Sequence, residues 1–258
     1  MKLHPSSWIA IGVTSLVGIV AFAWPFVTTA NASVASSPWV FMVLVPLLVL
    51  LVFAQLADGD LDAKRVAVLG VLAAVVSALR PLGGGAAGIE PIWFVIVLAG
   101  RALGPGFGFS LGSISMLASA FLTGGVGPWL PFQMLAAGWV GLGAGLLPAA
   151  TGKRELAITA IYGGVVAITY GLVMNLWFWP YLGALPDSVS FDAAAGPAAN
   201  FSHWLTFSIT TSLGFDIPRA VITVLLILLT GRPVLFTLRR ITRKAAFDVP
   251  VVFADSAN

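Results

Sequence analysis

The sequence has no cysteine and few charged residues. Of its 258 residues, 9% are Asp, Glu, Lys or Arg, whereas 59% are hydrophobic. A typical soluble domain has about 25% charged residues and spreads them over its surface, but long stretches of this chain have none. The absence of cysteine also excludes disulfides and thiolate metal sites. This composition indicates a protein that is embedded in a lipid membrane.

Motifs for catalysis and for nucleotide binding are missing as well. Thr151–Lys153 lacks the earlier glycine of a phosphate-binding loop. The run Gly104-Pro-Gly-Phe-Gly108 is glycine-rich, but its proline and apolar surroundings favour a tight bend in the membrane over a nucleotide turn. The two histidines, His4 and His203, are too far apart for an HExxH site. We therefore expect no enzyme activity, no cofactor and no metal site.

What the sequence does contain is long apolar stretches. Most can cross a ~30 Å hydrocarbon layer as helices at ~1.5 Å per residue, and they lack the alternating pattern of a membrane β-barrel. Two of them, 66–80 and 91–103, look short, which indicates helices that are broken or shielded by protein. We therefore predict an all-α integral membrane protein. Its eight apolar stretches are residues 8–28, 38–57, 66–80, 91–103, 105–123, 129–150, 156–180 and 205–231.

The polar segment Asp58–Arg65 divides these stretches into two groups. The two before it are almost purely aliphatic and aromatic, whereas the six after it are rich in Gly, Pro and polar residues. This contrast predicts an N-terminal two-helix hairpin with its linker at residues 1–63 and a six-helix substrate-binding core at 64–244. A short tail follows at 245–258.

Lys and Arg are distributed unevenly between the loops, which predicts the orientation in the membrane. The connection at about 181–203 has Asp187 and Asp192 but no basic residue. Arg80 and Arg219 are the only basic residues that this topology does not place in an inner loop. We expect a multi-pass protein of the bacterial plasma membrane with both termini in the cytoplasm. The inner loops then hold Lys2, Lys64, Arg65, Arg101, Lys153, Arg154, Arg232, Arg239, Arg240, Arg243 and Lys244.

One alternative concerns residues 1–32. Lys2 precedes an apolar run, and Ala30-Asn31-Ala32 has the small-x-small form of a signal-peptidase site. An ordinary first helix explains the same run, and cleavage would leave seven spans.

The segment Gly124–Met134 carries the strongest indication of a ligand site. Its glycines and prolines break the helix at the outer membrane edge and free backbone groups. Trp129, Phe132, Gln133 and Met134 then enter the next helix together, and they supply flat apolar surfaces, an amide and a thioether. This set suits a ring-shaped ligand with polar edges. A helix start with an interfacial tryptophan anchor explains it equally well.

Tryptophan gathers at the predicted outer ends of the helices, whereas a plain aromatic belt would occupy both faces. The excess predicts a stacking cavity open to the exterior, around Asn175, Trp177, Trp179, Tyr181 and Trp129. The tryptophans at outer ends are Trp24, Trp39, Trp93, Trp129, Trp177, Trp179 and Trp204.

Charged residues in the apolar segments are further candidates. Asp216 and Arg219 lie three positions apart and so share a helix face, where they form either a structural ion pair or a ligand contact. Glu90 and Arg80 flank the glycines at 83–85. This outer loop is either a lid with glycine hinges or merely flexible.

The third apolar stretch has a stripe of small residues, Gly70, Ala74 and Ala78, at four-residue spacing. Such a stripe lets another helix approach closely. The partner helix lies either inside the same bundle or on another subunit, and spacing alone does not separate the two cases.

In the order of these elements, residues 64–244 resemble the substrate-specific S components of energy-coupling factor (ECF) vitamin transporters. The resemblance rests on the small-residue helix at 66–80, the outer loop, the glycine-rich bend at 104–109, the stretch Gly127-Pro-Trp-Leu-Pro-Phe-Gln-Met134 and the terminal helix that opens with Phe215-Asp-Ile-Pro-Arg219. The leading helices at 8–57 depart from the six-helix pattern of the family.

The resemblance implies a bundle that binds one vitamin from outside and associates with a transmembrane coupling subunit and two ATPases. It also implies that Gly70, Ala74 and Ala78 dock the coupling subunit. The GPWLPFQM stretch is most similar to S components assigned to cobalamin or related corrinoids, while riboflavin and pyridoxine-like vitamins remain alternatives. The implied partners are thus the vitamin, these subunits and the lipid bilayer, with no nucleic acid.

A second hypothesis from a different class is an ion-coupled secondary transporter, for which Asp216 and Arg219 would relay the ion. No inverted repeat supports it.

Overall fold

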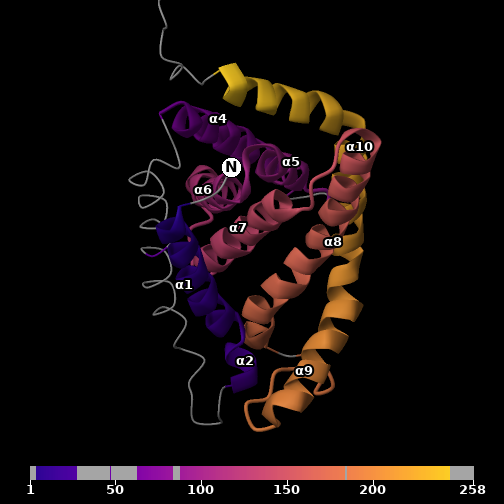
Figure 1. Cartoon of the computed structure of the whole chain (residues 1–258). Helices are drawn as coiled ribbons and strands as arrows, with labels where there is room; N and C mark the ends of the chain where they lie inside the picture. The colour runs from indigo at the N-terminus through magenta and orange to yellow at the C-terminus, as the bar shows by residue number, and fades with distance from the viewer. Residues whose placement is uncertain (1–3, 28–46, 48–62, 84–87, 184, 245–258) are drawn as a thin grey trace, which may run out of the picture.

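The computed structural model describes residues 4–27, 47, 63–83, 88–183 and 185–244. Over these residues the chain forms helices joined by turns and loops (Figure 1). Two short 3₁₀ turns, Arg80–Gly83 and Trp179–Tyr181, follow α4 and α8. The helices are α1 (Pro5–Phe22), α2 (Trp24–Val27), α4 (Ala63–Leu79), α5 (Trp93–Leu103), α6 (Pro105–Thr123), α7 (Leu130–Leu146), α8 (Gly152–Phe178), α9 (Gly196–Phe207) and α10 (Leu213–Lys244).

Five helical segments of the described chain are long and apolar enough to cross a membrane. They are Pro5–Phe22, Lys64–Gly83, Pro105–Thr123, Gly152–Tyr181 and Gly196–Ile241. The helices α5 and α7 are apolar but shorter, with 11 and 17 residues. The prediction of an all-α membrane protein is therefore confirmed.

The two stretches predicted to be short behave differently. In α5 the residues from Val95 to Gly100 are all buried, so this helix is shielded by protein as expected. The stretch at 66–80 is longer than predicted: it belongs to the 20-residue span Lys64–Gly83, and 22% of the apolar 18-residue window in this span is buried. The reason is local. The 3₁₀ turn at Arg80–Gly83 extends the helix past Arg80, where the uncharged run ends.

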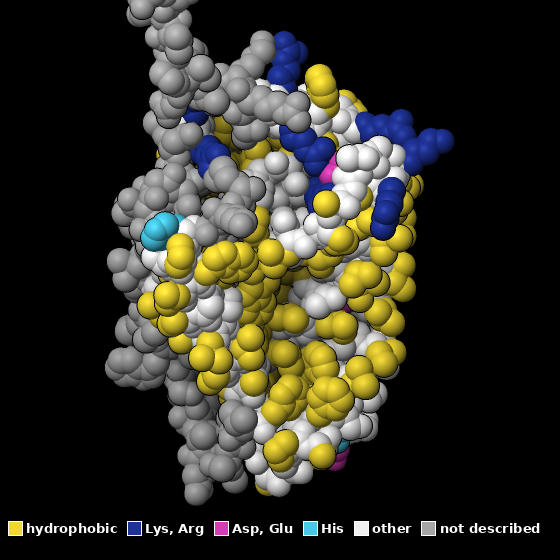
Figure 2. All heavy atoms as spheres, in the orientation of Figure 1, with side chains coloured by type: hydrophobic (Ala, Val, Ile, Leu, Met, Phe, Trp, Pro, Cys, Tyr) yellow, Lys and Arg dark blue, Asp and Glu magenta, His cyan; other side chains and the backbone are white. Residues whose placement is uncertain are grey.

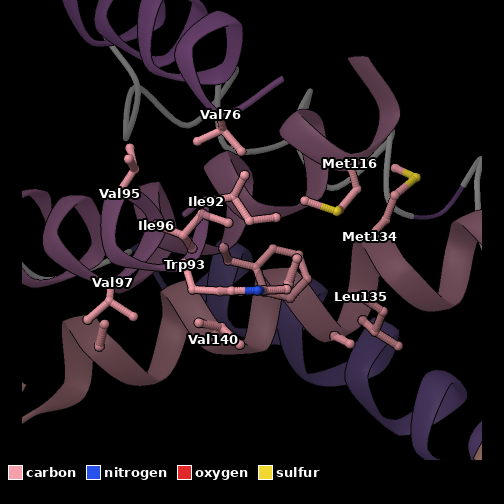
Figure 3. Packing of buried hydrophobic residues seen from close by; sticks show 14 of the residues in the cluster. Val76, Ile92, Trp93, Val95, Ile96, Val97, Met116, Met134, Leu135 and Val140 are labelled. Carbon is pink, nitrogen blue, oxygen red and sulfur yellow. The ribbon is translucent and has the colours of Figure 1, made fainter. Parts of the chain in front are cut away.

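The core of the bundle lies between α5, α6 and α7. Trp93 and Ile96 of α5 pack there with Met116 of α6 and Leu135 of α7 (Figure 3). The helices α6 and α7 approach closely, because a Cβ atom at Gly108 or Gly141 would meet the backbone of the other helix. Small residues thus allow backbone contact between neighbouring helices in lipid, where apolar burial alone gives no driving force.

The leading helix α1 packs on this core. Trp139 of α7 donates from Nε1 to Ser15 Oγ at 2.9 Å, and the Phe22 ring lies 4.9 Å from the Phe132 ring. The short helix α2 contacts α9 at the bottom of Figure 1. The predicted second helix at 38–57, the residues of the possible cleavage site at 30–32 and the tail at 245–258 lie outside the described residues.

The last span is longer than predicted at both ends. Its N-terminal part, α9, begins at Gly196, so the predicted connection at 181–203 is shorter than expected. A π-helical turn, Ser208–Ser212, joins α9 to α10. Beyond residue 231 the helix continues because buried Leu235 and Leu238 alternate with the arginines. An apolar run alone therefore underestimates this helix.

Basic side chains gather at one end of the bundle, at the top of Figure 2. There the last turns of α10 run across α4 and α5 (Figure 1), and Leu238 packs with Leu69 of α4 and Phe107 of α6. We call this the basic end, defined by Arg101, Lys153, Arg154, Arg232, Arg239 and Arg240. The opposite end, with α2, α9 and the tryptophans at 24, 177 and 179, is called the aromatic end.

Candidate ligand site

An ion-pair network joins the loop before α5 to the start of α10. The Glu90 carboxylate accepts hydrogen bonds from Arg219 Nε at 3.0 Å and from Arg219 Nη2 at 3.3 Å. Asp216 Oδ1 accepts from Arg219 Nη1 at 2.5 Å. Both Asp216 and Arg219 are buried. The pairing of Asp216 with Arg219 follows the three-residue spacing, and Glu90 adds a second acid to it.

Two glycines allow these side chains to meet. Gly88 has a φ of 81°, a conformation that side chains disfavour, and a Cβ there would also collide with the Phe215 backbone. This contact holds the loop that carries Glu90 against α10. On α8, Gly171 has no side chain at the place where the Asp216 carboxylate lies. A larger residue at either position would separate the network.

A second polar group lies where α4, α6 and α7 meet. Arg80 donates from Nη2 to Gln133 Oε1 at 2.7 Å. Its Nη1 donates to Ser119 Oγ and to the Met116 carbonyl, the latter at 3.4 Å. Arg80 and Gln133, predicted separately, are therefore direct partners, and both arginines that departed from the basic-loop pattern point into the protein.

Tyr170 of α8 lies between the two polar groups. Its ring is 4.1 Å from the Trp93 ring, and the Arg219 guanidinium carbon lies 5.7 Å from its centroid. Trp93 in turn donates from Nε1 to Glu90 Oε2 at 2.8 Å. Tyr170 also interacts electrostatically with Arg80, Glu90 and Arg219. The charged side chains and two aromatic rings thus form one continuous site.

A cluster of rings lies at the aromatic end of the bundle. Trp177 lies 6.1 Å from Trp129, 6.0 Å from Phe132 and 5.3 Å from Tyr181, measured between ring centroids. Trp24 of α2 lies 6.0 Å from Tyr181 and extends the cluster to the leading helices. Such a set offers stacking surfaces to a flat ligand.

Two buried polar atoms of the predicted site have no hydrogen-bond partner. In the described part of the chain, four buried side-chain polar atoms lack one, and two of them are Asp216 Oδ2 and Trp177 Nε1. Leaving such a group unsatisfied costs roughly 1–3 kcal/mol. One atom accepts and the other donates, so the site has hydrogen-bonding capacity for a ligand that carries both kinds of group.

One small cavity among the described residues adjoins the site. A cavity of about 100 Å³ adjoins Tyr170 between α7 and α8. Pockets for drug-sized ligands have volumes of roughly 300–1,000 Å³. This cavity by itself is too small for a ligand of that size. The residues that line the cavity are Ala136, Trp139, Val140, Val166, Thr169, Tyr170 and Val173.

Three predicted site residues have their side chains engaged within the protein. Met134 is buried in the core. Trp179 is fully buried, and its Nε1 donates to the Val189 carbonyl at 2.6 Å. Asn175 donates to Ser208 Oγ and Ser212 Oγ at the π-helical turn. These contacts brace the aromatic end, so we leave the three residues out of the ligand set that we propose below.

Sequence reasoning did not single out Tyr170 or Ser119. A tyrosine in an apolar helix gives little signal, and Ser119 has the appearance of a packing residue. At the basic end it also missed Glu155. This buried acid accepts from Arg101 Nε at 2.8 Å and from Arg239 Nη2 at 2.6 Å. An acid at the edge of an apolar helix is a signal that two basic partners face it.

The small-residue stripe faces away from the bundle. Gly70, Ala74 and Ala78 are all exposed, whereas the neighbouring Ala73 and Ser77 are buried against the core. No atom lies within 4 Å of a Cβ built on Gly70. Within the described residues the stripe is therefore not used for packing, and docking to another subunit stays a prediction.

These features define a multi-pass helical membrane protein with a polar, ring-lined site at one end. The family model described as "ECF transporter, substrate-specific component" matches residues 64–231, more than half of the 258-residue chain. The chain belongs to this family. It is thus a substrate-binding membrane subunit of a transporter, which is not a class of enzyme. Membership also implies a small-molecule substrate and interaction with coupling and ATPase modules. No curated protein and no solved structure matches the chain.

Proposed function

We propose that this protein captures a ring-containing vitamin at the aromatic end. The observation that carries the proposal is that two buried atoms of the site, Asp216 Oδ2 and Trp177 Nε1, have no hydrogen-bond partner among the described residues, and that Trp177 belongs to a cluster of rings. The ligand set comprises Arg80, Glu90, Trp129, Phe132, Gln133, Trp177, Asp216 and Arg219.

A charged or strongly hydrogen-bonding ligand would exchange the present contacts for its own. Arg80 and Gln133 now satisfy one another, as do Glu90 and Arg219. A ligand with polar edges can insert between such partners, while its flat face lies on the exposed ring of Trp129. Among ring-containing vitamins a corrinoid is the first to test, followed by riboflavin and pyridoxine-like compounds.

Translocation then requires an external source of energy. We propose that the exposed face of Gly70, Ala74 and Ala78 docks one transmembrane coupling subunit, which joins this protein to two ATPases. ATP binding would shift the bundle between outward and inward states, so conformational change is the mechanism. In this arrangement the aromatic end faces outside, and the basic end and both termini face the cytoplasm of the bacterial cell.

Purification from the native membrane tests the substrate. The protein is isolated in detergent, and small molecules that co-purify are identified by mass spectrometry and by absorbance. A corrinoid or flavin spectrum that disappears in Trp129→Ala supports the proposal. A ligand without a ring system would contradict it.

A second function, ion-coupled secondary transport, is favoured by the partly buried Glu90–Arg219–Asp216 network, because intramembrane acids serve as relays in such carriers. Reconstitution of the protein alone, with an imposed proton or sodium gradient, separates the two. Accumulation of ligand under those conditions would favour the ion-coupled carrier.

A further inference from the structure

A second polar pocket lies at the basic end, remote from the ligand site. It has a volume of about 820 Å³ and lies between the first turn of α8 and the last third of α10. Its lining residues are Gly152, Lys153, Glu155, Leu156, Arg232, Leu235, Phe236, Arg239 and Arg240. We call it the α8–α10 pocket.

The charges around this pocket favour an anion. Glu155 is its only acidic lining residue, and this buried carboxylate is already held by Arg101 and Arg239. Lys153, Arg232 and Arg240 are exposed, and within the described residues they form no ion pair. Three cationic side chains thus face the pocket without a protein counter-ion.

The pocket also has an apolar wall. Leu156 and Leu235 line it beside Phe236, whose side chain is 68% exposed. Phe236 lies one helical turn from Arg232 and from Arg240. Farther along α10, Leu225, Leu228 and Leu229 are exposed toward the surface that meets lipid. The apolar wall therefore continues from the pocket along the outside of the bundle.

This combination distinguishes a lipid from other anions. A soluble phosphate would gain nothing from Phe236 or from the leucines, and an acidic protein segment would have to cover an apolar surface at the membrane edge. A phospholipid has a phosphate for the cations and acyl chains for the apolar wall. Basic pockets between membrane helices are known to hold anionic head groups of lipids.

We propose that the α8–α10 pocket binds the head group of an anionic phospholipid, with Lys153, Arg232 and Arg240 around its phosphate. The first turn of α8 supports this placement, because Thr151 makes no side-chain cap and the N-terminal helix dipole favours negative charge. The bound lipid would hold the end of α10 against α8, next to the ion pairs of Glu155.

Native mass spectrometry of the full-length protein in detergent tests the proposal, with dioleoylphosphatidylglycerol as the anionic probe and dioleoylphosphatidylcholine as the zwitterionic one. We expect tighter binding of phosphatidylglycerol. Arg232→Gln/Arg240→Gln should weaken it about 25-fold, since each cation near the surface contributes roughly fivefold. Arg154→Gln is the matched control: Arg154 is exposed in the same turn as Lys153 but does not line this pocket. Equal affinity for the two lipids, or equal losses in the variant and the control, would overturn the proposal.

Further measurements distinguish binding of a lipid from binding of another anion. Phe236→Ser should weaken phosphatidylglycerol binding and leave glycerol phosphate binding unchanged. If glycerol phosphate binds as tightly as the lipid and Phe236→Ser affects neither, the site is one for a soluble phosphate. If Arg232→Gln/Arg240→Gln keeps the lipid but loses a co-purifying coupling subunit, the surface is a protein interface. Lys153→Gln, on the other helix, provides an independent variant should the double variant fail to fold.

Discussion

Glu90 and Arg219 are 129 positions apart and form an ion pair with 3.0 Å between Oε2 and Nε. The pair joins the loop before α5 to the last helix, across the C-terminal half of α8 near Tyr170. Arg219 also bonds to Asp216, so one guanidinium holds two acids. The network thus closes the bundle at the aromatic end, and any movement of the loop before α5 must break it.

Arg219→Gln should destabilise the protein strongly, because both acids would be left without their cation. Breaking a buried pair from one side costs roughly 3–5 kcal/mol. Glu90→Gln should cost less, since the Glu90 side chain is 28% exposed and Arg219 keeps Asp216. Thermal unfolding in detergent measures both, with Arg154→Gln as a surface control. Equal unfolding temperatures for the three variants would contradict this prediction.

Trp177→Phe should change ligand affinity without lowering the stability of the fold. The indole N–H of Trp177 is buried and has no acceptor among the described residues. Its removal should leave the unfolding temperature unchanged or higher, because an unsatisfied donor is lost. Affinity for the co-purified ligand should fall about tenfold if the ligand accepts from this N–H. Isothermal titration checks the affinity, and unchanged affinity would remove Trp177 from the site.

Trp129→Ala and Gln133→Ala should each weaken ligand binding. Loss of stacking on one ring costs about 0.5–1.5 kcal/mol beyond the lost contact area. Gln133 fixes the Arg80 guanidinium, so its loss should also disorder that cation. Phe121→Ala is the matched control, because Phe121 is a large exposed ring on α6 with no contact to the aromatic cluster. Wild-type affinity in both variants would place the pocket elsewhere.

Ala74→Trp should abolish transport and leave ligand binding by the isolated protein nearly intact. Ala74 is exposed on the small-residue stripe, and a bulky ring there prevents close helix contact, at a cost of ~1–3 kcal/mol or more. Uptake in cells and binding in detergent are measured side by side. Ile161→Trp, on the exposed side of α8, is the control. Equal loss of binding and transport by Ala74→Trp would indicate packing within the bundle.

Energy coupling distinguishes the two candidate functions. Uptake in cells should require co-expressed ATPases and should persist when proton and sodium gradients are collapsed while ATP is maintained. Asp216→Asn should weaken binding or folding, since it removes one acid from Arg219, without creating or removing an ion dependence. Uptake that stops with the gradients, despite ample ATP, would contradict the ATP-coupled proposal.

Local spacing predicted part of the site. The pairing of Asp216 with Arg219 follows from helix geometry, and the family resemblance is confirmed by the match over residues 64–231. The partners that spacing does not predict are distant in sequence: Glu90 for Arg219, and Gln133 for Arg80. They depend on how the helices pack, which an apolar pattern does not encode.

Helix lengths were predictable only where apolar residues end together with the helix. Trp93–Leu103 was expected to be shielded, and its burial agrees. The helix α10 continues to Lys244 because leucines on one face are buried while arginines occupy the others. A prediction based on runs of uncharged residues does not detect such an amphipathic helix end. For aromatic residues such as Trp179, position near a membrane edge does not separate a buried, hydrogen-bonded ring from a ring that is open to a ligand.

The short helix α5 separates two charged networks inside the protein. Glu90 precedes it in the network of Arg219, and Arg101 near its end belongs to the network of Glu155. The helix has 11 residues, which at ~1.5 Å per residue is about 16 Å, roughly half of the ~30 Å hydrocarbon layer. The two charged networks are therefore separated along α5 by about half the length that a lipid-facing helix needs to cross the layer.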